Sequence, residues 1–245
     1  MIRIRLPLLL VVTFAATALM AAPAMARQPI AVGLSIPDGR DMSVVDRTTW
    51  RYGAKPATWT IWSQWGHRGG ERGCYPRKRG SCAFPWTAAS RLADRGITPI
   101  IWWEPVQPNR PTYAFYPRYK NVVDGRHDHY IRRWAKDAAA FGRAHGTKVI
   151  VRYAQEVNGQ MFPWGVEKFD NDPRTFKKAW RRIHRIFRNQ GALPYVDFMW
   201  SVSKRSCHGC NPYARVYPGD AFVDYVGISA YNWGAARQWR SMERV

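Results

Sequence analysis

Acidic residues are scarce in this chain: 17 aspartates and glutamates stand against 38 lysines and arginines, and the formal net charge is +21. Such an imbalance raises a nucleic-acid-binding hypothesis. The basic residues, however, are spread along the whole sequence rather than gathered into one block. We therefore expect a generally basic surface and no specific nucleic-acid partner, with an acidic polymer left open as a non-specific one.

Other absences exclude classes of enzyme. No glycine-rich phosphate loop follows a strand pattern, and no serine or cysteine stands in a nucleophile elbow. Kinases, dehydrogenases and α/β-hydrolases are therefore poor candidates. His127-Asp128-His129 opens a predicted helix without a third ligand nearby, so a helix cap with solvated histidines is favoured over a metal site. We expect no metal and no cofactor.

Long apolar runs are confined to the N-terminus. Arg3 and Arg5 precede an apolar segment at 6–22, and Ala24-Met25-Ala26 follows with the small residues of a cleavage site. This order predicts a secretory signal peptide at residues 1–26 and an exported protein; a retained membrane anchor is the alternative. No later segment is apolar enough to span a bilayer, so we expect no membrane association after cleavage.

The chain has only four cysteines, Cys74, Cys82, Cys207 and Cys210. In an exported protein two disulfides are the expected arrangement, and local pairing of Cys74 with Cys82 and of Cys207 with Cys210 is the simplest one. The spacing of the second pair also suits a redox motif or half a zinc site. No thioredoxin-like unit surrounds it, which favours disulfides.

A regular alternation of strand and helix patterns fills the rest of the chain. Strands are predicted at 30–36, 59–63, 97–103, 149–151, 196–200 and 223–229, and helices at 87–94, 129–144 and 173–189. The alternation predicts an α/β fold with a parallel sheet, and the length is typical of a (β/α)₈ TIM barrel. About six β/α units are visible, so we expect residues 27–245 to form one catalytic barrel domain, incomplete at its C-terminal end. An open relative of the barrel is the alternative.

Candidate site residues stand where these strands end, the side on which parallel barrels carry function. Glu156 follows the fourth strand and Arg152, ahead of a turn at Asn158-Gly159. Aromatic side chains stack on the apolar faces of sugars, and carboxylates bind hydroxyl groups, so this combination suits a glycan. The alternatives are a plain ion pair between Glu156 and Arg152, and core packing for each tryptophan. The candidates for substrate binding at strand ends and in the following loops are Trp103, Glu104, Arg152, Gln155, Asn158, Trp164, Trp200, Tyr231 and Trp233.

Four segments resemble glycoside hydrolase family 26, the β-mannanase-like enzymes: 102–105, 152–164, 198–201 and 217–234. The resemblance implies a secreted, retaining endo-β-glycanase that hydrolyses β-1,4-mannan or a related β-glycan, with Glu156 as general acid/base. It also implies that Trp164, Tyr231 and Trp233 line the site. The implied partner is a polysaccharide substrate.

Two features depart from the family pattern. Gln155 stands where the family usually has a histidine, so substrate orientation is expected to differ. The family's nucleophile is a glutamate at the end of the seventh strand, and no seventh strand pattern is visible. We therefore expect a chain truncated before that strand and lacking the nucleophile. A non-catalytic glycan-binding barrel is the competing hypothesis.

Overall fold

The computed structural model describes residues 31–35, 41–65, 82–106, 118–166, 168–204 and 210–232, together with Gly234, Trp239 and Ser241. These residues belong to one compact unit that begins at Ala31. The predicted signal peptide, Cys74, Cys207 and Trp233 lie outside the described residues.

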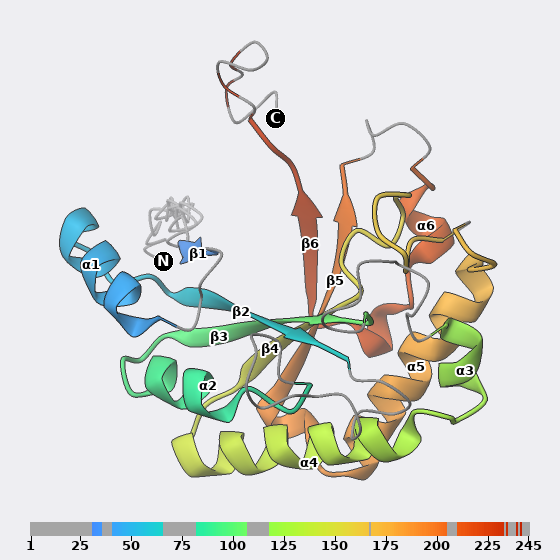
Figure 1. Ribbon diagram of the computed structural model, residues 1–245, viewed down its shortest axis with the longest axis horizontal. Helices are drawn as coiled ribbons and strands as arrows, with labels where there is room; N and C mark the ends of the chain where they lie inside the picture. The colour runs from blue at the N-terminus through green and yellow to red at the C-terminus, as the bar shows by residue number, and fades with distance from the viewer. Residues whose placement is uncertain are drawn as a thin grey trace, which may run out of the picture. The chain divides into compact units, whose positions relative to one another are not determined.

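Six strands form a single sheet in the order of the sequence, and every neighbouring pair is parallel (Figure 1). This is the arrangement of a partial (β/α)₈ barrel, because each strand is joined to its neighbour by a crossover connection. The strands are β1 (Gly33–Leu34), β2 (Thr58–Gln64), β3 (Thr98–Glu104), β4 (Val149–Tyr153), β5 (Val196–Ser203) and β6 (Tyr225–Ser229). The predicted parallel sheet is confirmed.

Helices follow the strands along the chain, and α2, α4 and α5 lie side by side along one face of the sheet (Figure 1). The α-helices are α1 (Met42–Tyr52), α2 (Trp86–Ala93), α3 (Tyr119–Val123), α4 (Asp128–His145), α5 (Pro173–Asn189) and α6 (Tyr213–Val216). Two short 3₁₀ helices, η2 (Leu193–Tyr195) and η3 (Asp220–Phe222), precede β5 and β6. The opposite face of the sheet carries the candidate functional site described below.

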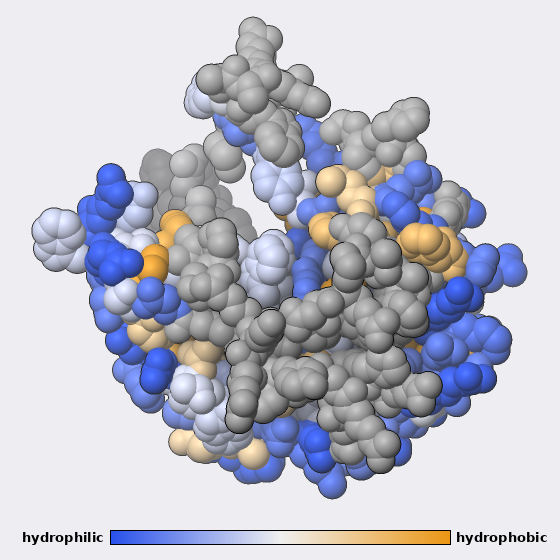
Figure 2. Space-filling view, in the orientation of Figure 1, coloured by the Kyte–Doolittle hydropathy of each residue, from blue (hydrophilic) through white to orange (hydrophobic). Residues whose placement is uncertain are grey.

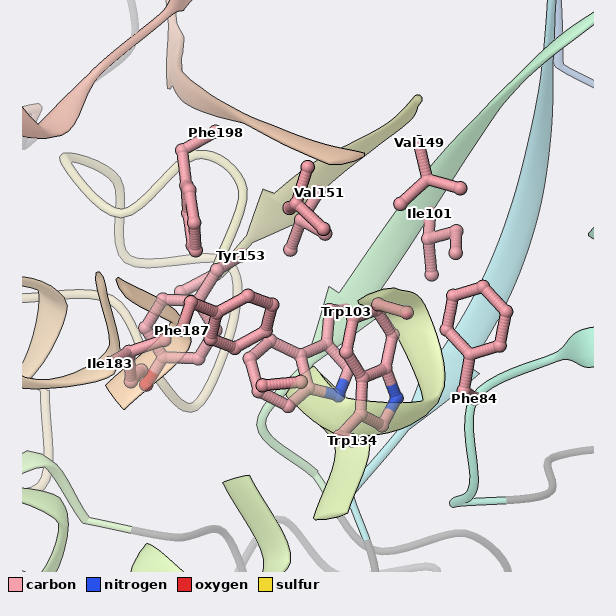
Figure 3. Packing of buried hydrophobic residues seen from close by; sticks show 14 of the residues in the cluster. Phe84, Ile101, Trp103, Trp134, Val149, Val151, Tyr153, Ile183, Phe187 and Phe198 are labelled. Atoms are coloured by element: carbon pink, nitrogen blue, oxygen red, sulfur yellow. The ribbon is translucent and has the colours of Figure 1, made fainter. Parts of the chain in front are cut away.

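The core lies between the sheet and these helices (Figure 3). Trp103 of β3 stacks on Trp134 of α4, with ring centroids 4.7 Å apart and planes 28° from parallel. Its indole Nε1 also donates a hydrogen bond of 3.0 Å to the Tyr130 hydroxyl. Phe198 of β5 packs edge-on against Phe187 of α5. These bulky aromatic contacts hold the helices against one face of the sheet.

Capping residues explain where helix α5 starts and where helix α4 ends. Asp172 caps α5, since its carboxylate accepts hydrogen bonds from the backbone N–H groups of Arg174 and Thr175. Gly146 ends α4 in the left-handed conformation at φ 59°. Asp128, expected to cap α4, is instead its first residue, and its carboxylate pairs with Arg182 of α5.

Three α-helices, α1, α3 and the four-residue α6, are absent from the sequence-based prediction. Helix α1 is rich in threonine and valine, which disfavour helix, but Asp41 stabilises its first turn by accepting a hydrogen bond from the Ser43 N–H group. Helix α3 lies between the predicted strand at 97–103 and the predicted helix at 129–144, where no helix was expected. Its Tyr119 is buried against Phe176 of α5, so tertiary packing stabilises a helix of five residues.

The described surface is mostly hydrophilic, with hydrophobic residues in small separate patches (Figure 2). Among the described helices, none combines the length and the apolar character needed to cross a membrane. Neither Cys82 nor Cys210, the two cysteines in the described ranges, is a free thiol. The pairing of the four cysteines stays a prediction.

Candidate functional site

The face of the sheet opposite the helices carries polar and aromatic side chains towards the C-terminal ends of the strands. Because side chains alternate along a strand, Trp102 and Glu104 lie on the opposite face of β3 from Trp103. In the parallel register Trp62 stands beside Trp102, Gln64 beside Glu104, and Trp102 beside Arg152. We call this surface the site face; its side chains are Trp62, Gln64, Trp102, Glu104, Arg152, Ser201 and Ser229.

Two tryptophans form an aromatic platform on the site face. The rings of Trp62 and Trp102 stack with centroids 5.1 Å apart and planes 14° from parallel. The guanidinium carbon of Arg152 lies 4.3 Å from the centroid of the Trp102 ring, in cation–π geometry. Trp62 keeps 43% of its surface exposed. The platform therefore offers an accessible flat apolar face next to a cation.

Arg152 of β4 connects to β5 and β6 through side-chain hydrogen bonds at the site face. Its Nε and Nη2 donate to the Ser201 hydroxyl of β5 at 2.8 and 2.6 Å, and Nη2 also donates to the Ser229 hydroxyl of β6 at 3.0 Å. Burial lowers the pKa of Arg152 to about 10, although Glu156, Tyr231 and Glu104 oppose that shift through their charges. The guanidinium remains charged at neutral pH and is the principal cation of the site.

Glu104 is held by two amide side chains. Its Oε1 accepts a hydrogen bond from Gln155 Nε2 at 2.8 Å, and its Oε2 accepts one from Gln64 Nε2 at 3.2 Å. Burial raises the pKa of Glu104, against the opposing effects of these two amides and of Arg152. The Oε1 atom of Gln155 is buried and has no hydrogen-bond partner among the described residues. It is therefore an acceptor whose hydrogen-bonding capacity no described residue uses.

Glu156 stands on an unusual stretch of backbone just after β4. Ala154 and Glu156 both adopt positive φ, at 48° and 55°, a conformation that residues other than glycine rarely take. The Glu156 N–H group donates to the Ser201 carbonyl of β5 at 2.9 Å, and the Glu156 carbonyl accepts from the Gly159 N–H group at 2.9 Å. These bonds hold a strained conformation, and such strain is concentrated at functional sites. The Glu156 residue is 92% buried, with 8% of its surface exposed.

Asn158 and Trp164 have structural contacts that hold the loop carrying Glu156. The Asn158 amide accepts from the Ser203 N–H group at 2.8 Å and donates to the Ser203 carbonyl at 3.0 Å, so both of its polar atoms are engaged. Trp164 donates from its indole Nε1 to the Gln155 carbonyl at 2.8 Å, and its ring stacks on Phe162. Asn158 is fully buried, so its predicted substrate contact is replaced by a role in fixing the loop.

The structure brings together Glu104, Arg152, Gln155 and Glu156 as expected, and it separates other candidates from them. Trp103 is fully buried in the sheet–helix core, and Trp200 is 4% exposed and packs edge-on against Tyr217. Both lack the exposed surface that a sugar contact needs, because strand alternation turns them towards the other face. Tyr231, beyond the end of β6, is 60% exposed and close enough to Arg152 to affect the pKa of the guanidinium.

Among the members of the site face that the sequence analysis missed are Trp62, Gln64 and Trp102. Strand periodicity could have found Trp102, because it lies two residues before Glu104 and must share its face. Trp62 and Gln64 needed the register between β2 and β3, which the sequence does not reveal. Among the described residues no group of three histidine, cysteine, aspartate or glutamate side chains could hold a metal ion. The chemistry available at the site face is that of carboxyl groups, amides and one guanidinium.

A parallel α/β sheet with an aromatic platform and buried carboxyl groups at its strand ends defines a protein of the glycan-active barrel class. Residues 119–242 match Glycosyl hydrolase family 26, which is 124 of the 245 residues. The chain belongs to this family of glycoside hydrolases.

Individual relatives agree with this assignment. The chain is 32% identical over 173 residues to endoglucanase H of Acetivibrio thermocellus, covering 67% of this chain and 18% of that protein. It is 28% identical over 111 residues to mannan endo-1,4-beta-mannosidase A and B of Caldalkalibacillus mannanilyticus, covering 41% and 21%. The aligned part thus spans about a fifth of the length of these two relatives.

A solved Bacillus subtilis mannanase superposes with a TM-score of 0.58 at 21% identity, over 81% of this chain and 61% of that chain. At this identity the similarity supports the fold alone. The six parallel strands match part of the (β/α)₈ barrel of such enzymes.

Proposed function

We propose that this chain is part of the catalytic barrel of a retaining endo-β-glycanase that hydrolyses β-1,4-mannan or a closely related β-glycan. The observation that carries the proposal is the placement of Glu156: a nearly buried carboxylic acid on a strained turn at the end of β4, beside the Arg152 guanidinium. Glycoside hydrolysis requires a carboxylic acid that protonates the leaving oxygen and later activates water. We assign that role to Glu156.

The aromatic platform supports a sugar-binding role for the site face. A sugar ring stacked on Trp62 and Trp102 would bury its apolar face, while its hydroxyl groups meet Arg152, Glu104 and the free Oε1 of Gln155. The amide of Gln155 is neutral, so it contributes hydrogen bonding and no charge at a position next to the acid/base. Tyr231 is the exposed residue that we propose as a further substrate contact. We place Trp164 as a support for the loop and propose Trp233 as a contact from its sequence position only.

The retaining mechanism needs a second carboxyl group as nucleophile, roughly 5–5.5 Å from the first. Glu104 is a poor choice for that role, because both of its oxygens are held by amide groups and burial favours its neutral form. We therefore assign Glu104 to substrate binding and propose that the nucleophile comes from a strand other than the six described. Export through the predicted signal peptide would bring the enzyme to polysaccharide outside the cell.

The decisive experiment compares Glu156→Gln with wild type in the full-length secreted protein, using soluble β-mannan. Asp170→Asn is the matched control, since Asp170 is an exposed carboxylate whose ion-pair partner among the described residues is the exposed Arg118. Loss of the general acid should lower the rate of hydrolysis by about 10²- to 10⁴-fold. Binding of the mannan, measured by affinity electrophoresis, should persist, and the control should keep wild-type turnover.

Undiminished hydrolysis by Glu156→Gln would overturn the assignment of the acid/base. Binding without any product from the wild-type protein would replace the enzyme with a non-catalytic glycan-binding barrel.

A further inference from the structure

Helix α5 gathers basic residues that the sequence leaves scattered. Its segment 173–189 contains no acidic residue, and its apolar side chains are buried against the sheet. The exposed basic positions are spaced alternately four and three residues apart, so they share one side of the helix. We call this set the basic row: Arg174, Lys178, Arg181, Arg185 and Arg188, all of them exposed.

The basic row is a local concentration of charge within a chain whose basic residues are spread along the whole sequence. At about 1.5 Å per residue its five side chains extend over about 21 Å, roughly one cation every 5 Å. Helix α5 lies at the right of the view in Figure 1, and hydrophilic residues dominate the described surface on that side in Figure 2.

Most of this charge is uncompensated. Lys178, Arg185 and Arg188 form no ion pair with any described residue. Arg181 donates from Nε to the Pro218 carbonyl at 2.8 Å, a neutral partner that orients the guanidinium without cancelling its charge. Arg174, the first member of the row, is close to an acidic group, the helix cap Asp172.

Within the described residues Arg181 bonds to the Pro218 carbonyl and lies over the Phe222 ring, but these contacts of one member do not explain the composition of the whole row. Like charges three and four residues apart repel one another and destabilise an isolated helix by a few tenths of a kcal/mol per pair. The row contributes nothing to the site face, because its side chains point away from the sheet that α5 covers. A repulsive arrangement on a solvent-facing helix is explained by a partner that carries negative charge.

The chemistry of the row restricts that partner. The row has no exposed aromatic residue, which single-stranded nucleic acids use as a stacking platform. It has no exposed apolar residue that could enter a membrane interface. Duplex DNA carries one charge per about 1.7 Å, several times denser than the row. A linear polymer with one carboxylate on each sugar carries charge at wider intervals and needs no stacking.

We propose that the basic row of α5 is a second glycan-binding surface, separate from the site face, that binds linear acidic polysaccharides of the polyuronide type. Such binding would hold the enzyme in a mixed polysaccharide matrix where its neutral substrate is found. The acidic chain is a docking partner and is not cleaved. The existence of this surface does not depend on the proposed hydrolytic activity.

The test measures binding of polygalacturonate to the full-length protein at 50 and 200 mM salt. The row variant is Lys178→Gln/Arg185→Gln/Arg188→Gln. The control variant is Arg51→Gln/Arg91→Gln/Lys136→Gln, which removes the same charge from three exposed positions on α1, α2 and α4 that form no ion pair with a described residue. Thermal melting checks that both variants fold.

At low salt the row variant should lose at least about tenfold in affinity and show a shallower dependence of affinity on salt, because fewer ions are released on binding. The control variant should lose much less. Hydrolysis of β-mannan by the row variant should match wild type, which separates this surface from the site face.

Equal losses in the two variants would mean general charge attraction and would overturn the proposal. Tighter, row-dependent binding to duplex DNA or to vesicles of anionic lipid than to polygalacturonate would overturn the assigned partner class. Failure of the wild-type protein to hydrolyse mannan, with row-dependent binding intact, would contradict the proposed function and leave this inference standing.

Discussion

Replacing Arg152 by lysine keeps the positive charge at the site face and removes the geometry through which it acts. The guanidinium donates three hydrogen bonds, to Ser201 of β5 and Ser229 of β6, and lies over the ring of Trp102. An ammonium group is compact and strongly hydrated, so in this buried position it can reach at most one of the two hydroxyl groups. The variant therefore loses two charged hydrogen bonds and the ring contact.

The expected loss follows from these contacts. Two hydrogen bonds from a charged donor at about 1.5 kcal/mol each, and a cation–π contact of about 0.5–2 kcal/mol, give a destabilisation of about 3.5–5 kcal/mol. That is a large part of the free energy of unfolding of an ordinary domain. Urea unfolding followed by tryptophan fluorescence measures it directly.

Arg185→Lys is the matched control, because Arg185 is exposed and forms no ion pair with a described residue. Its free energy of unfolding should stay within about 0.5 kcal/mol of wild type. If Arg152→Lys changes stability by less than about 1 kcal/mol, the three hydrogen bonds do not hold the strands together as described, and the account of the site face is wrong.

Three further substitutions test separate parts of the structure. Asn158→Ala should destabilise by about 2–4 kcal/mol in urea unfolding, because it leaves the N–H and carbonyl groups of Ser203 unpaired; the exposed Asn189→Ala should have little effect. Burial lowers the pKa of His127, so the unfolded chain binds more protons and stability should fall as pH drops below about 6.5. His127→Phe should flatten that fall between pH 7.5 and 5, and an unchanged slope would contradict it. Trp62→Ala should weaken mannan binding by about tenfold with stability nearly unchanged, since the ring is partly exposed and forms half of the platform.

Regular periodicity made most of the fold predictable. Helix α5 was predicted over 173–189 and observed over Pro173–Asn189, because a strong apolar stripe coincides with a capping aspartate and a proline at the first position. The strands were found within a few residues of their observed ends for the same reason. Helix α1 was missed because its threonine and valine residues favour a strand locally, whereas tertiary packing stabilises a helix there.

The site was predictable only in part. Glu156, Arg152 and Glu104 follow from the rule that function lies at strand ends, since each is a charged residue in an otherwise apolar context. The choice of Trp103 over Trp102 ignored strand alternation and placed a core residue in the site. Other features depend on strand register and tertiary contacts, which no local pattern encodes. They are the hydrogen bonds from Gln64 and Gln155 to Glu104, and the left-handed backbone at Ala154 and Glu156.

The central claim is that Glu156 protonates the leaving group, and the dependence of the rate on that group tests it most directly. An alanine at position 156 should slow the hydrolysis of β-mannan by about 10²- to 10⁴-fold, because an alkoxide-like sugar oxygen needs a proton to depart. The same Glu156→Ala variant should release dinitrophenolate from a dinitrophenyl β-mannoside in a first turnover within about tenfold of wild type, since that group departs unaided. Equal losses on both substrates would contradict the role assigned to Glu156.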